Sequence, residues 1–170
     1  ILDNVIQQVA PGVTTQELDD TAMDLFTAKN VKPAFLGYRG FPKALCTSIN
    51  EEVVHGIPSE ERVLKQGDIL SVDIGLVYKG YYSDMAVTVP VGDVSSQAAD
   101  IIDAGRRTLL RAIDAIEPGM PLRELSSAIQ TYAEDRGYNV LRKYVGHEIG
   151  KKMHEEMQIP NFTSRGYPSA

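Results

Sequence analysis

The chain has 170 residues, of which 43% are hydrophobic and 24% charged, and its net charge is −6. This composition is typical of one globular domain with a substantial core, and the length excludes two large domains. The acidic charge balance argues against nucleic acid or an anionic membrane surface as the main partner. No apolar run approaches the ~18 residues of a membrane span. The single cysteine, Cys46, fits a reducing compartment such as the cytoplasm.

Helical patterns open the chain. Residues 1–9 carry an apolar stripe at helical spacing, which Pro11-Gly12 ends. Thr14 or Thr15 can cap a second helix, with Glu17 in its first turn. We expect the buried face of that helix to comprise Leu18, Ala22, Leu25 and Phe26. Short extended segments are expected at 34–36 and 44–49.

The segment ILSVDIGLVYKGYYSDMAVTV, residues 69–89, predicts a β-hairpin with its turn near Lys79-Gly80. A turn at 78–79 or at 79–80 puts Asp73 opposite or diagonal to Asp84, on the same face of the sheet. Burying two carboxylates is unfavourable unless a cation compensates their charge. Such a pair could hold one metal ion or two, whereas the alternative is two solvated residues at strand ends.

Two longer helices follow the hairpin. One is expected at 96–117, ended by Pro118-Gly119, and the other at 122–136, ended by Gly137. A strand is expected at 139–145, with loops after it. The apolar face of the first of these helices comprises Ala99, Ile102, Ala104, Leu109, Leu110, Ile113 and Ile116.

The stretch at 11–31 resembles the stretch at 118–140, 107 residues later. Four identities carry the similarity: Pro11, Gly12, Glu17 and Leu18 match Pro118, Gly119, Glu124 and Leu125. Pro-Gly before a capped helix is common, so coincidence is the alternative. A true repeat predicts two related halves, about 1–106 and 107–170, within one domain. The second half would then need its own carboxylate-bearing hairpin, which would fall beyond residue 170, so the chain is expected to be incomplete.

All three histidines lie in segments rich in glycine or acidic residues: His55 in NEEVVHGIP, His147 in YVGHEIG and His154 in KKMHEE. This setting raises the prospect of one shared site. An imidazole added to two carboxylates suits Mn, Fe, Co or Zn. The sequence has no cysteine pair for a structural zinc, no GxSxG motif and no glycine-rich phosphate loop.

Three segments together resemble type I methionine aminopeptidases. They are GYRGFPKALCTSINEEVVHGIP at 37–58, VDIG at 72–75 with DMAVT at 84–88, and GHEIGKKMHEEMQIPNF at 146–162. The resemblance spans about residues 11–162 and keeps the order and spacing of the family. It implies an α+β pita-bread fold, with two pseudo-symmetric halves around a site for two divalent metal ions and the second half truncated here.

The resemblance assigns roles to particular residues. It implies that Asp73, Asp84 and His147 are metal ligands for two ions (Co, Mn, Fe or Zn), while the two glutamate ligands of the family have no matching position in 155–170. The 170-residue piece is therefore expected to be inactive and to bind at most one ion weakly. The resemblance also implies that His154 stabilises the tetrahedral intermediate and that His55 binds the scissile amide or the substrate amine. The apolar substrate pocket would comprise Tyr38, Phe41, Cys46 and Met153, with plain core packing as the alternative.

The resemblance implies removal of the initiator methionine from nascent proteins by a cytoplasmic monomer, and it leaves ribosome association open. Three positions depart from the common pattern of the family: Phe35, Glu148 and Met157. One alternative is an Xaa-Pro aminopeptidase or prolidase of the same fold. The other is a non-catalytic module of this fold that only binds peptides.

Overall fold

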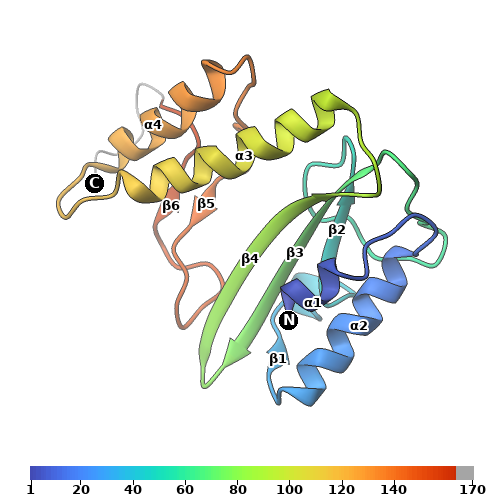
Figure 1. The fold of residues 1–170 in the computed structure, drawn as a ribbon. Helices are drawn as coiled ribbons and strands as arrows, with labels where there is room; N and C mark the ends of the chain where they lie inside the picture. Colours follow the sequence, from blue (N-terminus) through green and yellow to red (C-terminus); the bar gives the residue numbers. More distant parts are fainter. Residues whose placement is uncertain (164–170) are drawn as a thin grey trace. The chain divides into compact units, whose positions relative to one another are not determined.

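Four antiparallel strands form the larger sheet of the protein (Figure 1). This sheet carries the two candidate aspartates, Asp73 and Asp84. Strands β3 (Ile69–Tyr78) and β4 (Tyr81–Pro90) form its long hairpin. Strands β1 (Lys32–Pro33) and β2 (Leu45–Ile49) both pair with the other edge of β3. The structure is a computed structural model that describes residues 1–163.

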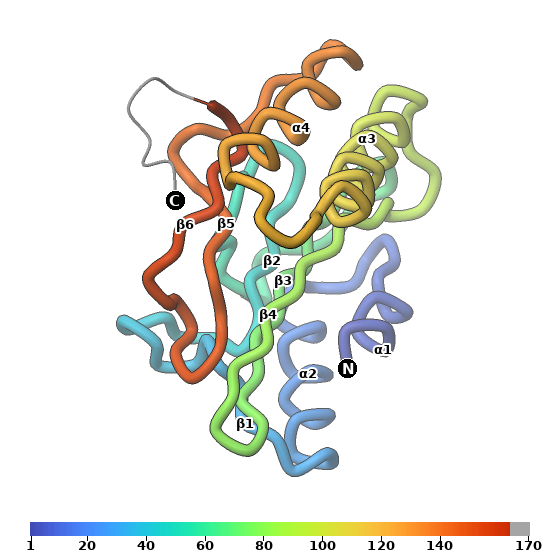
Figure 2. Tube along the Cα trace, turned by 90° about the vertical axis from the view of Figure 1, so that its left-hand side faces the viewer, coloured from blue at the N-terminus to red at the C-terminus, as the bar shows by residue number. Residues whose placement is uncertain are grey.

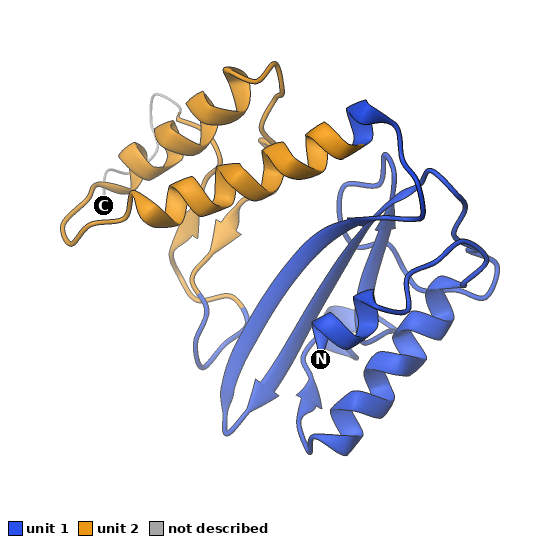
Figure 3. Cartoon of the chain, viewed as in Figure 1, with its two compact units in different colours: residues 1–98, 149–153 blue, residues 99–148, 154–170 orange. Residues whose placement is uncertain are grey.

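The chain divides into two compact units (Figure 3). The first comprises residues 1–98 together with the short segment 149–153. The second comprises residues 99–148 and the chain from 154 onwards. Compactness is a different criterion from sequence repetition, so the division into halves near residue 106 stays a prediction.

The predicted hairpin is confirmed, and its turn lies at Lys79-Gly80. Tyr78 pairs with Tyr81, and the two turn residues have φ angles of 50° and 84°. Positive φ at both central positions is the geometry of a type I′ turn, whose twist matches that of the flanking strands. Glycine at the second position adopts this conformation without a steric penalty.

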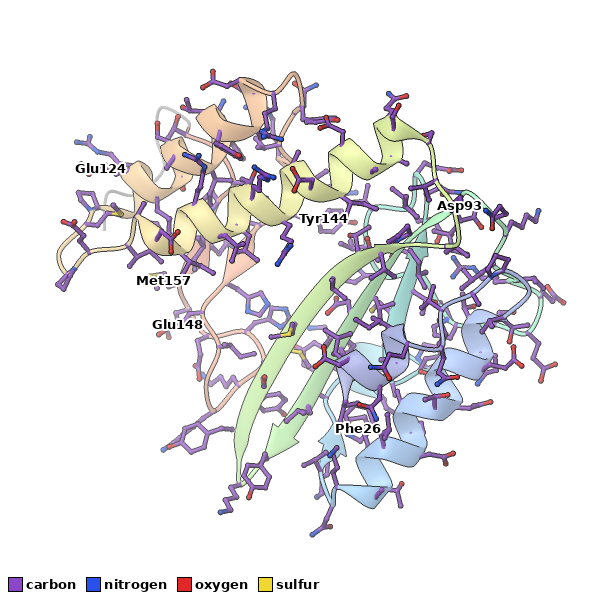
Figure 4. The ribbon with its side chains drawn as sticks, viewed as in Figure 1. Phe26, Asp93, Glu124, Tyr144, Glu148 and Met157 are labelled. Carbon is purple, nitrogen blue, oxygen red and sulfur yellow. The ribbon has the colours of Figure 1, made fainter. Side chains whose placement is uncertain are left out.

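Helices α1 (Leu2–Ile6) and α2 (Thr15–Ala28) lie together on one face of the sheet (Figures 1 and 2). Alternate residues of β2 and β3 point toward these helices because side chains on a strand alternate between the two faces. The resulting core contains Leu18, Ala22 and Phe26 of α2, the last labelled in Figure 4, together with Leu45, Leu70, Val72 and Ile74 of the sheet.

The start of α2 confirms the predicted cap. Thr14 is the N-cap, and its hydroxyl accepts a hydrogen bond from the Glu17 backbone N–H at 3.2 Å. The Glu17 carboxylate in turn accepts one from the Thr14 backbone N–H at 2.7 Å. This reciprocal pair is a capping box, and it satisfies two backbone donors that the helix itself leaves without partners.

The second unit contains most of α3 (Ser96–Asp114), all of α4 (Leu122–Glu134) and a two-strand ladder of β5 (Gly146–His147) and β6 (Gln158–Ile159). Charged and aromatic side chains link the two helical segments. Asp103 of α3 contacts Arg136, two residues after α4, at 3.6 Å, and the Arg111 guanidinium of α3 lies 4.7 Å from the ring centroid of Tyr132 of α4. Part of the apolar face predicted for residues 96–117 is exposed, namely Leu109, Leu110 and Ile113 of α3 and Ile116 after its end.

The proposed internal repeat gains support from local backbone geometry. Helices α2 and α4 begin at positions 15 and 122, which are 107 residues apart like the matched sequence. Gly12 and Gly119, before these helices, have φ angles of 92° and 86°. The hydrogen bonds that end the helices recur at the same spacing: Val31 N–H to Phe26 O (3.1 Å) and Tyr138 N–H to Ala133 O (3.0 Å). The N-caps differ, because Thr14 forms a capping box and Pro121 has no side-chain cap, so the repeat stays a prediction that the glycine geometry and the helix exits support.

Two strand predictions are wrong. Residues 139–145 form no strand; the ladder begins at Gly146 instead. The Asn161 side-chain amide donates to the carbonyls of Leu141 and Tyr144 at 3.3 and 3.1 Å, so a side chain satisfies backbone groups there. Residues 34–36 bend into the short 3₁₀ helix η1 (Tyr38–Gly40), and the strand lies just before them, at β1. The other boundaries shorten: α1, α3 and α4 end at Ile6, Asp114 and Glu134.

Within residues 1–163, none of the helices combines the length and the apolar character needed to cross a lipid bilayer.

A buried carboxylate fixes where β2 begins. Asp19 of α2 is only 4% exposed, and its Oδ1 atom accepts hydrogen bonds from the backbone N–H groups of Ala44 and Leu45, both at 2.9 Å. Burial raises the pKa of Asp19, and the two backbone donors oppose that rise. Helix α2 therefore holds the start of β2 through the backbone N–H groups that donate to Asp19.

Replacing Asp19 tests this link. Asp19→Ala leaves two buried donors unsatisfied and should lower the free energy of unfolding by roughly 1.5–3 kcal/mol. Asp19→Asn keeps an oxygen acceptor and should lose less. Urea unfolding followed by circular dichroism measures both. The exposed neighbour Asp20 provides the control, since Asp20→Ala should stay within about 0.5 kcal/mol of the parent protein. Equal stability of Asp19→Ala and the parent would contradict the assignment.

Candidate active site

The β3–β4 register brings the two predicted aspartate ligands to one face of the sheet. Asp73 lies across from Ala86, and Asp84 lies across from Gly75. The two carboxylates are therefore diagonal neighbours, one of the two arrangements that the sequence left open. Because Val72 and Ile74 point into the core with α2, Asp73 points to the opposite face, away from that helix.

The aspartate pair is electrostatically strained without a cation. The pKa of Asp73 is raised to about 8, first because burial disfavours its charged form and then because of the charge of Asp84 and a hydrogen bond with it. At neutral pH the metal-free Asp73 side chain therefore holds a proton. A divalent cation would compensate the second negative charge in the same place, so the donor set fits a hard or borderline metal ion.

Cys46 lies directly across from Asp73 on β2 and shares its face. Its side chain is buried, and its pKa is raised to about 12, mainly by burial and then by the charges of Asp73 and Asp84. The thiol is thus neutral at physiological pH and behaves as a small apolar group. Cys46 connects the carboxylates to the apolar residues beside them.

The four residues predicted to form the apolar substrate pocket lie together in one apolar cluster of the first unit. Cys46 and Met153 are buried in it, and Tyr38 and Phe41 pack against it from η1 and the residue after it. Met153 reaches this cluster because the segment 149–153 is hydrogen-bonded to β4, where the Tyr82 N–H donates to the Gly150 carbonyl at 2.7 Å. Phe35, named from the sequence as a departure from the family pattern, also belongs to the cluster, and sequence reasoning missed three further members: Ala34, Val77 and Tyr82. For Tyr82 the signal was present, since it precedes Asp84 by two residues and shares its face.

Phe35, one of the three departures from the family pattern, packs over the sheet at Gly75. A Cβ atom on Gly75 would lie 2.5 Å from the Phe35 ring, so only glycine allows the ring to approach this closely. Gly75 is the direct cross-strand neighbour of Asp84. The aromatic ring therefore lies beside the carboxylate pair as part of the apolar cluster.

His55 lies in a loop that is tied to strand β2. Its backbone has a φ of 62°, in the left-handed region that few residues other than glycine adopt. The next residue, Gly56, accepts a hydrogen bond from the Thr47 N–H at 2.8 Å and donates one to the Ser48 hydroxyl at 3.2 Å. A Cβ atom on Gly56 would lie 2.1 Å from the Thr47 carbonyl oxygen, so this close approach requires glycine.

The other two histidines meet in the second unit. The rings of His147 and His154 have centroids 4.2 Å apart and planes inclined by 41°. The β5–β6 ladder supports this pair, because His147 pairs with Gln158. Glu148 and Met157, both labelled in Figure 4, are exposed and contribute a backbone hydrogen bond of 2.9 Å beside the ladder. These two departures from the family pattern therefore leave the local backbone pairing intact.

Each unit thus brings some of the predicted side chains together. Within either unit, the described residues contain no group of three or more His, Cys, Asp or Glu side chains that could hold a metal ion. The first unit pairs the aspartates and adjoins them to the apolar cluster, and the second pairs the histidines. That Asp73, Asp84 and His147 bind common ions stays a prediction.

Comparison with known proteins identifies the class. The sequence profile of metallopeptidase family M24 matches residues 1–169, and the chain belongs to this family. Within the family it is similar to methionine aminopeptidases. The methionine aminopeptidase of Clostridium acetobutylicum is 46% identical over 164 residues, which cover 96% of this chain and 66% of that protein. Methionine aminopeptidase 1 of Bacillus subtilis is 42% identical, with 92% and 62% covered. The chain therefore spans slightly less than two thirds of the length of these curated relatives.

Solved structures confirm the pita-bread fold. The methionine aminopeptidase of Thermotoga maritima matches with a TM-score of 0.94 and 44% identity, over 98% of this chain and 67% of that one. The prolidase of Pyrococcus furiosus matches with a TM-score of 0.78 at 22% identity, over 96% and 47% of the two chains. The second likeness shows the shared fold alone. Both agree with the α+β fold that the sequence predicted.

The raised pKa of Asp73 predicts a pH dependence of stability in the metal-free protein. The folded pKa of Asp73, about 8, exceeds its ordinary value of 3.8, so the folded state holds the Asp73 proton more tightly. That contribution is fully present below pH 4 and is lost as the pH rises through 8. We expect the free energy of unfolding, measured with urea in the presence of EDTA, to fall by on the order of a few kcal/mol between pH 5 and 8.

Three variants separate this effect from other titrations. Asp73→Asn is neutral throughout and should remove this part of the slope. Asp84→Asn removes the repulsion but not the burial, so it should only reduce the slope. Asp24→Asn, at an exposed position of α2, should leave the slope unchanged. An unaltered slope in Asp73→Asn would show that the carboxylate pair is not the cause.

Proposed function

We propose that this protein removes the N-terminal methionine from polypeptides by metal-dependent hydrolysis. The observation that carries the proposal is the register of β2 and β3, in which Cys46 of the apolar cluster lies directly across from Asp73. A surface suited to an apolar side chain thereby adjoins the residues suited to a metal ion. The names of the relatives, at 40–46% identity, support the same activity.

Asp73, Asp84 and His147 would hold two divalent ions, with Co, Mn, Fe and Zn as the candidates. When bound, such ions lower the pKa of a coordinated water and supply a nucleophile near neutral pH. The protein contributes two carboxylates whose mutual repulsion the ions relieve. The neutral Cys46 thiol beside them adds no further negative charge to the site.

The remaining histidines would act on the substrate. His154 would donate a hydrogen bond to the oxygen that becomes negative as the peptide carbonyl is attacked. His55 would bind the scissile amide or the amine of the substrate. A donor aimed at developing charge is typically worth about 2.7–4 kcal/mol, so each histidine is expected to matter for turnover rather than only for binding.

The apolar cluster would select the methionine side chain. Tyr38 and Phe41 offer aromatic rings, and Cys46 and Met153 offer polarizable sulfur. Contacts between a thioether and an aromatic ring contribute about 0.3–1.5 kcal/mol each, and an unbranched side chain reaches them more easily than a branched one. The buried ring of Phe35 would further limit the width available to the side chain.

The proposal extends to the setting of the reaction. The substrates would be nascent chains that begin with methionine, and the protein would act as a cytoplasmic monomer. Association with ribosomes stays open. A protein specific for Xaa-Pro peptides is the second candidate, and the fold it shares with prolidases is the only observation in its favour. A non-catalytic peptide-binding module is the third, and the presence of both catalytic histidines argues against it.

Substrate and metal dependence test the activity. The full-length protein supplied with Co or Mn should release methionine from Met-Ala-Ser and should leave Xaa-Pro peptides almost uncleaved. EDTA should abolish the release, and adding back the metal should restore it. Liquid chromatography of the free amino acid measures each reaction. Faster cleavage of Xaa-Pro peptides would favour the prolidase alternative, and peptide binding without cleavage would favour the binding module.

Substitution of the histidines tests their roles. His154→Ala should lower kcat by about 10²–10³-fold with little change in KM, because the lost donor acts on the transition state. His55→Ala should also lower kcat by orders of magnitude. Steady-state kinetics on Met-Ala-Ser measures both, with circular dichroism as the check on folding. If His154→Ala raised only KM, a role in ground-state binding would replace the proposed one.

A further inference from the structure

The loop that carries His55 is closed by an ion pair between Glu52 and Arg62. The Glu52 carboxylate contacts one terminal nitrogen of the Arg62 guanidinium. The same carboxylate oxygen accepts a hydrogen bond of 2.8 Å from the backbone N–H of Ile49, the last residue of β2. The other terminal nitrogen of Arg62 donates to the carbonyl of Ile57 at 2.8 Å. Together, these three contacts connect the end of β2, the middle of the loop and Arg62 at its far end.

Arg62 is itself fixed on the first unit. Its carbonyl accepts a hydrogen bond of 2.9 Å from the backbone N–H of Thr15, the first residue of α2. Nearby, the Ser59 N–H donates to the Thr15 hydroxyl at 3.0 Å. The guanidinium therefore extends from an anchored backbone, and its side chain is only 22% exposed. Most exposed ion pairs lack such anchoring and contribute little.

His55 lies in the chain between the two residues that Arg62 contacts, Glu52 and Ile57. The Ile57 carbonyl lies two residues after His55, and Glu52 lies three residues before it. Between them the His55 backbone has a positive φ of 62°, a conformation that persists only when surrounding contacts enforce it. The Thr47–Gly56 hydrogen bond holds one side of this turn. The ion pair and its backbone contacts hold the rest.

We infer that Glu52 and Arg62 are positioning residues that hold His55 for the reaction. The inference rests on the proposed function, in which His55 contacts the substrate. Neither charged side chain has to touch the substrate. A planar guanidinium reaches a carboxylate and a carbonyl at once, which a lysine ammonium on a flexible chain does not do equally well. Small errors in the placement of a catalytic group can slow a reaction by up to about 10²-fold.

Kinetics of Arg62→Met, Arg62→Lys and Glu52→Gln in the full-length protein tests the inference. We expect each change to lower kcat on Met-Ala-Ser by about 10-fold or more, with KM changed less than about 2-fold. The decisive readout is the His55→Ala background, in which the same three changes should have almost no further effect. The expected non-additivity arises because the ion pair acts only through His55.

A second readout does not depend on turnover. The proton NMR signals of the His55 ring should shift or broaden in each variant, while those of His147 and His154 stay in place. Glu60→Gln makes the same change of charge at an exposed position of the same loop and serves as the control, with unaltered kcat and spectra. Glu52→Gln is nearly isosteric, so it keeps the test valid if Arg62→Met folds poorly.

The outcomes are distinguishable. Equal slowing of the parent and of the His55→Ala enzyme would overturn the inference and assign the ion pair a purely structural role. Unchanged kcat and unchanged His55 signals in all three variants would overturn it as well. If His55→Ala itself turned over normally, the proposed role of His55 would be wrong, and the inference would fall with it.

Discussion

The mutual repulsion of Asp73 and Asp84 on one half-buried face of a sheet is the constraint on which the rest of the candidate site depends. A β-sheet rarely carries two carboxylates at such positions, because burial penalises each charge and proximity penalises the pair. Burial and then the charge of Asp84 accordingly raise the pKa of Asp73. A proton on Asp73 relieves the penalty, and a bound cation would do the same. If the pair binds metal ions as we propose, metal affinity should be coupled to pH.

The surroundings of the pair follow from strand geometry. Alternation along β2 and β3 sends Leu70, Val72 and Ile74 toward the helices, and it sends Cys46, Asp73 and Gly75 to the other face. The helical side supplies the hydrophobic core that holds the sheet in shape. On the other side, Cys46 has a small side chain and Gly75 has none, and this leaves room for Phe35 beside the carboxylates. One register thus sets the core, the charged pair and the apolar cluster together.

Loops complete the arrangement through backbone contacts rather than through strands. Gly56 binds the backbone of β2, the segment 149–153 binds β4 through Gly150, and the Glu52–Arg62 pair closes the loop around His55. The contact between Gly150 and Tyr82 brings a segment that is distant in sequence to the sheet, whereas the other two act within the loop that follows β2. The buried carboxylate of Asp19 performs a similar task at the start of β2. Strands hold side chains in more precise positions than loops do, so loop residues that are hydrogen-bonded to the sheet are also held in place.

Local sequence determined much of this protein. The helix cap at Thr14 or Thr15, a hairpin turn near Lys79-Gly80 and the strand alternation around Asp73 and Asp84 depend on neighbours a few residues away, and all were predictable. The proposed 107-residue repeat also predicted that the ends of α2 and α4 would be alike, as their hydrogen bonds are. Tertiary structure alone decided contacts between distant segments. The hairpin could place Asp84 opposite or diagonal to Asp73 until the turn register was known. The sequence at 139–145 favoured a strand, yet the Asn161 amide satisfies its carbonyls instead. The raised pKa of Asp73, the packing of Phe35 on Gly75 and the anchoring of Arg62 depend on burial and on long-range hydrogen bonds, which no local pattern encodes.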